Sequence, residues 1–369
     1  MIRVLQVVKA MERGGLETYL MNVYRNIDRQ KIQFDFMVHR EKPGVYEKEI
    51  KQLGGQIYRI TSRRDNYKRN IQELNDFFST HTYYKIIHMH ESSMSYIEPL
   101  KIAHKHGIPI TIMHSRNNYV TTGKLSVILH YFNRVLYLKY ITDFFAISDK
   151  AAIWMFGKKN FRMNKVKLLK NGIEVERFKF SEEKRQQLRD HMNIGKNEIV
   201  IGHVGRFSPQ KNHIFLLRVF EKICEISNNY KLLLIGDGEE KERIKGIIER
   251  SSIKNKIIIM DSTSAINELY NVMDIFALPS LFEGLGRVLI EAQCNGLKTI
   301  ATKSKIPNEV KIISTFEFVD LQVDSWVEAI LKSEIKRVDN SSEIVAAKGY
   351  DMKQIAKQLE LFYLSKYTI

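Results

Sequence analysis

Cysteine is scarce in this chain. Its 369 residues include two cysteines, Cys224 and Cys294, too few for the disulfide framework that holds many small secreted domains together. No stretch approaches the roughly 18 apolar residues that a membrane-spanning helix needs. The start, Met1–Lys9, is too short for a signal peptide and is interrupted by Gln6 and Lys9, so we expect a buried strand there. The scarcity of cysteine predicts a cytoplasmic, reducing setting.

Acidic residues are scarce in the first half. Residues 1–170 contain 29 Lys and Arg against 14 Asp and Glu, so this half carries nearly all of the net charge of +16. Such a field favours an anionic partner: a membrane surface, a phosphate-bearing acceptor or a nucleic acid. A lysine-rich surface without such a partner is the plain alternative. Nucleic-acid binding would need basic residues interleaved with aromatics on one platform; here they are spread along the chain, so we expect no nucleic-acid partner.

A dinucleotide fingerprint is also absent. Enzymes that bind NAD(P) typically carry Gly-x-Gly-x-x-Gly after the first strand, but Gly14-Gly15 stands in that place. A dinucleotide-dependent oxidoreductase is therefore disfavoured.

Short apolar strands alternate with longer amphipathic stretches along the whole chain, a pattern typical of parallel βαβ units. In the first half the expected strands are Ile2–Val8, Gln33–Val38, Gln56–Ile60, Ile86–His88, Ile110–Met113 and Asp143–Ala146. In the second half they are Ile199–Val204, Lys231–Ile235, Lys256–Met260, Ile275–Leu278 and Lys298–Ala301. The pattern predicts an α/β protein with two doubly wound sheets.

The boundary between the two sheets is expected near Gly172–Phe180, because Asn171-Gly172 is a turn signal and a charged stretch follows it. We therefore predict one domain over residues 1–172 and another over 181–350. Residues 351–369 have helical spacing and no strand after them, so we expect a helix that packs back on the first domain.

A loop with two cations directly follows the expected strand Ile199–Val204. It contains Gly205, Arg206 and Lys211. Ligands of open α/β sheets gather outside the carboxyl ends of the strands. There the planar fork of an Arg and the point charge of a Lys suit a diphosphate, although two solvated cations are the plain alternative.

A second loop, Glu283–Glu291, follows another expected strand and opens a helix. Gly284 and Gly286 let the backbone approach a ligand closely, and free amides at a helix start suit a phosphate. Glu283 and Glu291 lie roughly 12 Å apart along a helix at 1.5 Å per residue. They are too distant to share one proton, so they suit opposite ends of one extended ligand. The plain alternative is that Glu283 is an ordinary residue of the first helical turn and Glu291 an exposed carboxylate.

These motifs resemble those of one enzyme family. The spacing of Glu283 and Glu291 matches the Glu-x7-Glu signature of glycosyltransferase family 4, whose members are retaining enzymes with the GT-B fold. Its other landmarks occur in order over almost the whole chain: Gly14–Glu17, Met113–Ser115, Phe145–Ser148, Lys170–Ile173, Gly205–Lys211, Leu234–Gly238 and Asp274–Ser280. The capsule and exopolysaccharide branch looks nearest. The resemblance implies two Rossmann-like domains facing across a cleft, the first binding an acceptor and the second a nucleotide-sugar donor, with a C-terminal helix returning to the first.

The resemblance also implies roles for individual residues. Arg206 and Lys211 would bind the donor diphosphate and stabilise the leaving group, Glu283 would hold the sugar, and Glu291 the ribose. His114 would lie beside the sugar, near its C6 hydroxyl. Further donor contacts are expected from Gly15, Gly205, Gly284, Leu285, Gly286 and Arg287. The acceptor side would include Gly14, Glu17, Arg116 and Asn117, followed by Asn118 and Tyr119.

The expected reaction moves a sugar from a nucleotide sugar, UDP-linked in our prediction, to a glycan or polyprenyl-diphosphate-linked acceptor in cell-surface polysaccharide synthesis. Transfer to a small molecule or a protein is the alternative, and a basic nucleic-acid-binding protein is a remoter one. The basic first half predicts contact with the anionic inner face of the plasma membrane. No cofactor and no metal are expected, because Arg206 and Lys211 supply positive charge at the diphosphate.

Two further features allow more than one interpretation. Leu125–Tyr140 has helical apolar spacing, which predicts an ordinary core-facing helix or, in a basic domain, a helix in a membrane interface. His88 and His90 share one face of a strand and with His114 suggest zinc. Since no third ligand stands at metal-site spacing, we expect no metal there.

Overall fold

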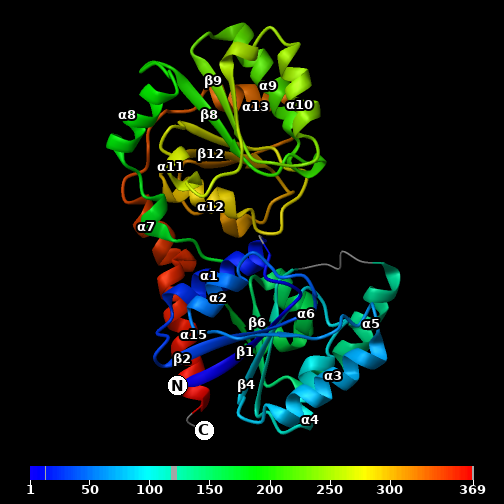
Figure 1. The fold of residues 1–369 in the computed structure, drawn as a ribbon. Helices are drawn as coiled ribbons and strands as arrows, with labels where there is room; N and C mark the ends of the chain where they lie inside the picture. Colours follow the sequence, from blue (N-terminus) through cyan, green and yellow to red (C-terminus); the bar gives the residue numbers. More distant parts are fainter. Residues whose placement is uncertain (13, 118–122, 368–369) are drawn as a thin grey trace. The chain divides into compact units, whose positions relative to one another are not determined.

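The chain divides into two compact units (Figure 1). The computed structural model describes residues 1–12, 14–117 and 123–367. The first unit consists of Met1–Gly172 together with the segment from Met352 onward, and the second of Ile173–Asp351. Each unit is built around one parallel sheet.

The described part of the first unit holds a seven-stranded sheet in the order β3-β2-β1-β4-β5-β6-β7. Its strands are β1 Ile2–Val8, β2 Ile32–Val38, β3 Ile57–Arg59, β4 Ile86–Glu91, β5 Ile110–Ser115, β6 Asp143–Ala146 and β7 Val166–Leu168. Its helices are α1 Gly15–Asn26, α2 Glu47–Gln52, α3 Tyr67–Thr80, α4 Glu98–Lys105, α5 Lys124–Leu136, α6 Asp149–Arg162 and α15 Met352–Tyr367, with a 3-10 turn at Leu138–Tyr140.

Strand β1 shows how the sheet is covered on both faces. Val4 and Val8 belong to the core under α1 and α15, whereas Leu5 and Val7 belong to the opposite core with residues of α3, α4 and α6. This alternation follows from the two-residue repeat of a strand. Because both faces are buried, the strand is apolar at nearly every position.

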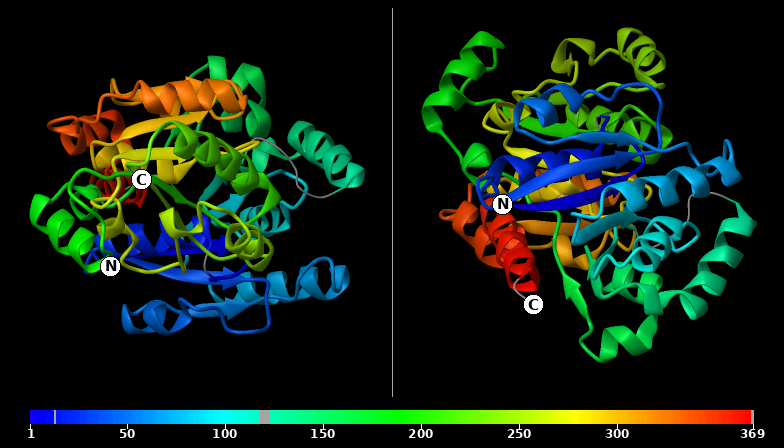
Figure 2. Two further views of the ribbon diagram at one scale, coloured as in Figure 1. Left: turned by 90° about the horizontal axis from the view of Figure 1, so that it is seen from above. Right: turned by 60° about the horizontal axis from the view of Figure 1, so that its bottom comes forward.

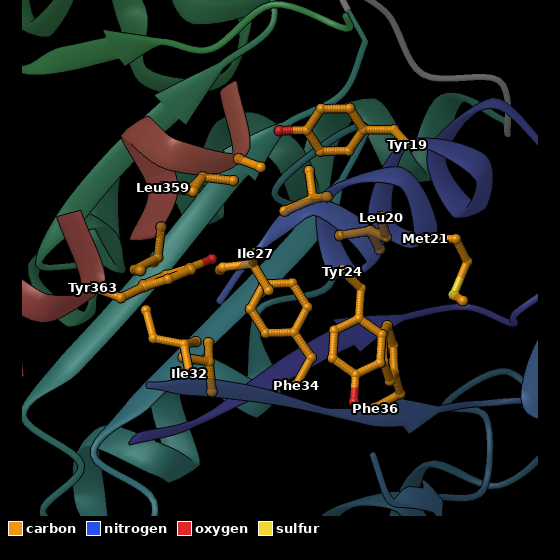
Figure 3. Packing of buried hydrophobic residues seen from close by; sticks show 14 of the residues in the cluster. Tyr19, Leu20, Met21, Tyr24, Ile27, Ile32, Phe34, Phe36, Leu359 and Tyr363 are labelled. Atoms are coloured by element: carbon orange, nitrogen blue, oxygen red, sulfur yellow. The ribbon is translucent and has the colours of Figure 1, made fainter. Parts of the chain in front are cut away.

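Helix α15 completes the first of these cores. It lies alongside α1, red beside blue in Figures 1 and 2. Figure 3 shows Tyr363 of α15 approaching Phe34, whose ring it meets edge-on at 6.0 Å, while Tyr24 of α1 stacks on Phe34 at 5.3 Å. Burying large side chains of this kind stabilises a fold by roughly 1.5–3 kcal/mol each. The returning helix predicted from its spacing is therefore confirmed as part of the first unit.

Helix α5 does not face the core with its apolar side. Leu125 and Val135 are 69% and 80% exposed, and Ile128 and Phe132 are also exposed. The core-facing interpretation of this stretch is wrong, because the buried residues of α5 are the polar His130 and Asn133. His130 stacks on Trp154 with ring centroids 4.0 Å apart.

The second unit is organised in the same way. Its sheet, over the described residues, has the order β10-β9-β8-β11-β12-β13. The strands are β8 Ile199–Val204, β9 Tyr230–Ile235, β10 Ile257–Met260, β11 Ile275–Leu278, β12 Lys298–Thr302 and β13 Phe316–Val319. The helices are α7 Val175–Phe178, α8 Glu182–His191, α9 His213–Ile226, α10 Lys241–Glu249, α11 Ile266–Leu269, α12 Arg287–Cys294, α13 Val323–Leu331 and α14 Ser341–Val345. Short 3-10 or π turns occupy Pro209–Lys211, Lys254–Lys256, Asn308–Val310 and Ala346–Tyr350.

The second unit begins before residue 181. Val175 and Phe178, on α7, are buried in its core, so the segment after Gly172 packs with the second sheet and is not a free linker. None of the helices in the described ranges has both the length and the apolarity to cross a membrane.

Candidate active site

Two loops of the second unit meet at the carboxyl ends of adjacent strands. Strands β8 and β11 are neighbours in the sheet, so the loops after Val204 and Leu278 leave it side by side. There Lys211 Nζ donates to Glu283 Oε1 over 2.6 Å. Both side chains are largely buried, with 15% and 8% of their surface exposed. The pair brings a fixed cation and a carboxylate to the place where ligands of this fold class bind.

Backbone contacts hold the same two loops together. Leu281 N donates to Gln210 O over 2.8 Å, and Gln210 Nε2 donates to Phe282 O, also over 2.8 Å. Asn212 takes the left-handed conformation, with φ of 57°, and caps α9. These hydrogen bonds hold the turn that carries Lys211 in place. Less conformational entropy is therefore lost when Lys211 binds a ligand.

Two glycines shape the start of α12. Gly286 has φ of +73°, a conformation that other residues rarely adopt, and it places the first amides of α12 at the loop. A Cβ added to Gly284 would meet no atom within 4 Å. The backbone beside Glu283 is thus open to a ligand, as a phosphate or a sugar at a helix start requires.

Glu291 lies inside the protein, one to two turns into α12. It is 6% exposed, accepts from Tyr270 Oη over 2.9 Å and pairs with Arg287 Nε at 3.1 Å. Burial raises the pKa of its carboxyl, and Arg287 opposes that rise. The arrangement aims the carboxylate while leaving lone pairs that two hydroxyls of a ligand can use.

Arg206 stands at the surface of the same loop. Its Nε pairs with Glu239 Oε2 at 3.0 Å, and 72% of its side chain is exposed. Gly236, with φ of +154°, packs so closely that a Cβ there would collide with the carbonyl of Gly205. Gly205 itself is tight, because a Cβ would lie 3.2 Å from Lys211 Cδ. These close approaches explain the glycines on both loops.

In the first unit, Gly14 and Gly15 begin α1. Gly14 is the N-cap, and a Cβ on it would collide with the carboxylate of Glu17. Nothing lies within 4 Å of a Cβ added to Gly15. Burial raises the pKa of the Glu17 carboxyl. Glu17 lies in the first turn of α1, where a negative charge interacts favourably with the helix dipole.

His114 and Arg116 form a second polar group in the first unit. His114 is fully buried at the end of β5, and Arg116 Nη1 donates to its Nε2 over 3.2 Å. The guanidinium also donates to Asn171 Oδ1 over 2.6 Å and lies over the ring of Tyr19 at 4.2 Å.

Asn117 follows, and its carbonyl accepts from Ser115 Oγ over 3.2 Å. The expected acceptor residues Asn118 and Tyr119 lie outside the described residues.

The structure thus joins three pairs of the predicted residues directly: Lys211 with Glu283, Arg287 with Glu291, and Arg116 with His114. Sequence reasoning missed Tyr270 and Gln210. Tyr270 precedes Glu291 by 21 residues, and no motif marks it. Gln210 stands inside a predicted loop, but its role is visible only once the neighbouring loop is placed.

Models of two protein families match the chain. The model described as "Glycosyl transferases group 1" matches residues 184–352, and that of "Glycosyltransferase Family 4" matches residues 13–177. A protein of Bacillus subtilis (strain 168) named "Putative glycosyltransferase EpsF" is 30% identical to this chain over 362 residues. The match covers 95% of this chain and 94% of EpsF. The chain belongs to glycosyltransferase family 4.

Other proteins are similar to this glycosyltransferase over different shares of its length. The capsular polysaccharide biosynthesis glycosyltransferase CapH of Staphylococcus aureus is 25% identical and covers 99% of both chains. An Escherichia coli enzyme, UDP-Gal:alpha-D-GlcNAc-diphosphoundecaprenol alpha-1,3-galactosyltransferase, is 25% identical over 46% of this chain and 45% of its own. The crystal structure of HepE from Anabaena in complex with UDP superposes with a TM-score of 0.76 at 16% identity, over 99% of this chain and 100% of HepE. The fold is GT-B, as the motifs implied.

Proposed function

We propose that this glycosyltransferase moves a sugar from a UDP-sugar, with retention, to a glycan or polyprenyl-diphosphate-linked acceptor in the synthesis of a cell-surface polysaccharide. The contact between Lys211 and Glu283 carries the proposal. This contact places side by side the two groups that would bind a nucleotide sugar: a cation for the diphosphate and a carboxylate for the sugar hydroxyls.

The donor would redistribute this pair when it binds. Its diphosphate offers Lys211 a stronger anionic partner, and the release of Lys211 leaves Glu283 as an acceptor for two hydroxyls of the sugar. Arg206 is exposed and pairs with Glu239 at the surface, so it can turn to the same diphosphate. The first amides of α12 add fixed partial charges.

Transfer requires no protein nucleophile in this proposal. The bond between the sugar C1 and the phosphate oxygen breaks while the acceptor oxygen bonds to C1 on the same face. The acceptor proton passes to the departing phosphate oxygen. Lys211, Arg206 and the amides stabilise the charge that develops on the diphosphate, a kind of contribution that is often worth 10²–10³ in rate per group. These cations make a metal at the diphosphate unnecessary in our proposal.

The uridine end would be held by Glu291. Its carboxylate, oriented by Tyr270 and Arg287, is suited to a pair of ribose hydroxyls. The UDP in the HepE complex supports UDP as the nucleotide. Gly15 and His114 stay predicted donor contacts, and Gly14, Glu17, Arg116 and Asn117 stay predicted acceptor residues.

The acceptor is proposed from charge and relatives together. The first half carries nearly all of the net positive charge, which suits an anionic diphosphate lipid at an anionic membrane. CapH is named for capsular polysaccharide, and the Escherichia coli enzyme for a diphosphoundecaprenol substrate. The exposed apolar side of α5 supports contact with the inner leaflet, and we propose a cytoplasmic, membrane-peripheral location.

A donor screen tests the proposal. The purified protein is incubated with UDP-, GDP- and ADP-sugars, each with and without polyprenyl-diphosphate-linked glycans, and the released nucleotide is measured. We expect release from one UDP-sugar, stimulated by acceptor, and nearly lost in Lys211→Met. Release from no nucleotide sugar would overturn the proposed reaction, whereas release from a GDP- or ADP-sugar would overturn only the choice of nucleotide.

A further inference from the structure

A groove of about 820 Å³ lies between the helices α3, α4 and α5 of the first unit, which Figure 1 shows together on one side of its sheet. Its volume falls within the roughly 300–1,000 Å³ of pockets that enclose small organic ligands. Much of its wall is apolar or aromatic: Ile71, Ile102, Leu129, Phe132, Tyr137 and Tyr140. The groove therefore offers an apolar ligand an enclosed place apart from the loops of the candidate active site.

Several polar side chains of the wall are already paired within the protein. Arg63 Nη1 lies 3.4 Å from Glu98 Oε1. Asn75 Nδ2 and Asn133 Nδ2 each donate to a backbone carbonyl over 2.7 Å. Because these groups have partners, an alkyl chain can lie against them without leaving a buried polar group unpaired.

Two lysines at one end of the groove carry positive charge without an acidic partner. Lys101 and Lys105 line the groove and are exposed, and their spacing of four residues puts them on one face of α4. Neither forms an ion pair with any residue in the described parts of the chain. Lys101 Nζ lies 4.9 Å from the centre of the Tyr137 ring. Tyrosines and long cationic side chains are typical of protein surfaces at the level of lipid headgroups.

This cationic end lies at the amino edge of the sheet. Helix α4 ends at Lys105, and a short loop leads from it into β5 at Ile110. Ligands of this fold class bind at the carboxyl ends of the strands, and the six residues of β5 put roughly 20 Å between the two edges. An anion at Lys101 and Lys105 is therefore not the reacting end of the acceptor.

The groove opens onto the exposed apolar side of α5. Phe132 lines the groove and is also 55% exposed, and Ile128 and Val135, which are exposed as well, lie one helical turn before and after it. We have proposed that this side of α5 contacts the inner leaflet. An acyl chain can therefore pass from the leaflet into the groove along a continuous apolar surface.

We propose that the groove binds one anionic phospholipid, with an acyl chain between α3, α4 and α5 and the phosphate against Lys101 and Lys105. The proposal rests on the membrane-peripheral location proposed above and goes beyond it, because it assigns a site to a single lipid. Burial of the chain supplies affinity in proportion to the apolar area removed from water. The lysines favour a negative headgroup over a neutral one. The bound lipid holds the first unit to the membrane at a defined place.

Binding of a monomeric lipid tests the groove separately from the membrane surface. Full-length protein is titrated calorimetrically with dihexanoyl-phosphatidylglycerol below its micelle concentration, and with dihexanoyl-phosphatidylcholine as the neutral counterpart. We expect one phosphatidylglycerol per chain, bound about 10-fold more tightly than phosphatidylcholine, since two cations meet the headgroup. Absence of binding would overturn the site, and equal affinity for the two lipids would overturn the role of the lysines.

Paired variants locate the lipid. Leu129→Trp enlarges a side chain that lines the groove and should weaken phosphatidylglycerol binding by about 10-fold or more. Leu125→Trp, the same change at an exposed position of α5 that is not part of the groove, is the matched control and should bind as the wild type does. Lys101→Gln with Lys105→Gln should remove the preference for phosphatidylglycerol, whereas Lys68→Gln, on the exposed side of α3, should keep it. Unchanged binding in a folded Leu129→Trp protein would overturn the proposal.

Wild-type protein alone keeps the test decisive if a variant does not fold. A phosphatidylglycerol with a diazirine in its acyl chain is photolysed on the protein, and the labelled peptides are identified by mass spectrometry. We expect label on the peptides of α3 and α5 that line the groove; label confined to other elements would overturn the site. Farnesyl diphosphate that binds more tightly than phosphatidylglycerol and displaces it would show a prenyl chain to be the occupant and overturn the choice of a phospholipid.

Failure of this proposal is distinguishable from failure of the proposed function. Vesicle binding without monomeric-lipid binding would leave the peripheral location standing and remove the groove as a lipid site. The donor screen measures nucleotide release without any phospholipid, so its result does not depend on the groove.

Discussion

Lys211 Nζ and Glu283 Oε1 lie 2.6 Å apart although 72 residues separate them in the sequence. The contact exists because β8 and β11 are adjacent in the sheet. Either residue alone would be costly to bury, since an unpaired charge inside a protein loses its hydration. Their pairing ties the stability of the loops to the groups that we propose for catalysis.

Separating these two roles requires a double variant. We expect Lys211→Met to lower kcat by about 10²–10³ and to lower the free energy of unfolding by about 1–3 kcal/mol, because Glu283 is left buried without its partner. Lys211→Met combined with Glu283→Gln should recover part of the stability and none of the activity. Steady-state rates and denaturant unfolding measure both. Lys303→Met, which removes a surface pair with Asp320, should change neither; a stable Lys211→Met with wild-type rates would remove Lys211 from the site.

Glu291 should govern the affinity for UDP. Glu291→Gln keeps the volume of the side chain and removes the charge, and we expect it to weaken UDP binding by about 10-fold, since a charge-assisted hydrogen bond is worth roughly 1.5–3 kcal/mol. Tyr270→Phe, which removes only the hydroxyl that orients Glu291, should cause a smaller loss. Isothermal titration with UDP measures both. Unchanged affinity in a folded Glu291→Gln protein contradicts the ribose role.

Helix α5 should bind anionic membranes. Replacing the most exposed apolar residues, as in Leu125→Glu with Val135→Glu, should reduce co-sedimentation with phosphatidylglycerol vesicles by about 10-fold or more, because each buried apolar side chain contributes roughly 1.5–3 kcal/mol. Val45→Glu, at another exposed apolar position of the first unit, is the matched control. Equal binding of the wild type to anionic and neutral vesicles would argue against the proposed surface.

Glu91 predicts a pH-dependent stability. It ends β4, and burial raises the pKa of its carboxyl to about 7, with Lys9, Arg63 and Arg64 opposing the rise. Between the unfolded pKa near 4.5 and this value the folded state binds more protons, so the contribution of Glu91 to stability falls as pH rises through that range. Glu91→Gln should therefore raise the thermal midpoint by a few °C at pH 8 and hardly at pH 4.5. Exposed Glu41→Gln should show no such pH dependence; an equal gain at both pH values would contradict the assignment.

Most of the strands follow from patterns that the sequence displays. The strands β1, β6, β8 and β11 have the predicted bounds because each is a buried apolar run with clear ends. Two edge strands, Val166–Leu168 and Phe316–Val319, were not predicted. Edge strands are partly exposed to solvent. Because these two contain Lys167 and Glu317, their sequences lack the continuous apolar run that predicts a buried strand.

The limits of prediction at the site are of a different kind. Residues such as Lys211, Glu283 and Glu291 stand in recognisable motifs, whereas their contacts depend on which strands are neighbours. The same holds for His90 and His114, which become a pair only through the register of β4 and β5. For α5, periodicity predicts a two-faced helix but does not say which face is inside. The stacking of His130 on Trp154 decides that.

The place of α15 has a consequence for how the protein is made. The core beneath α1 needs Leu359, Phe362 and Tyr363, which leave the ribosome after the whole second unit. At about 5–20 residues per second, the first unit waits roughly 10–40 s for this helix while the second unit already has all of its strands. The N-terminal unit is therefore expected to mature last, with apolar surface of α1 and β2 exposed in the meantime, and a chain that stops before α15 should be a substrate for chaperones and proteases.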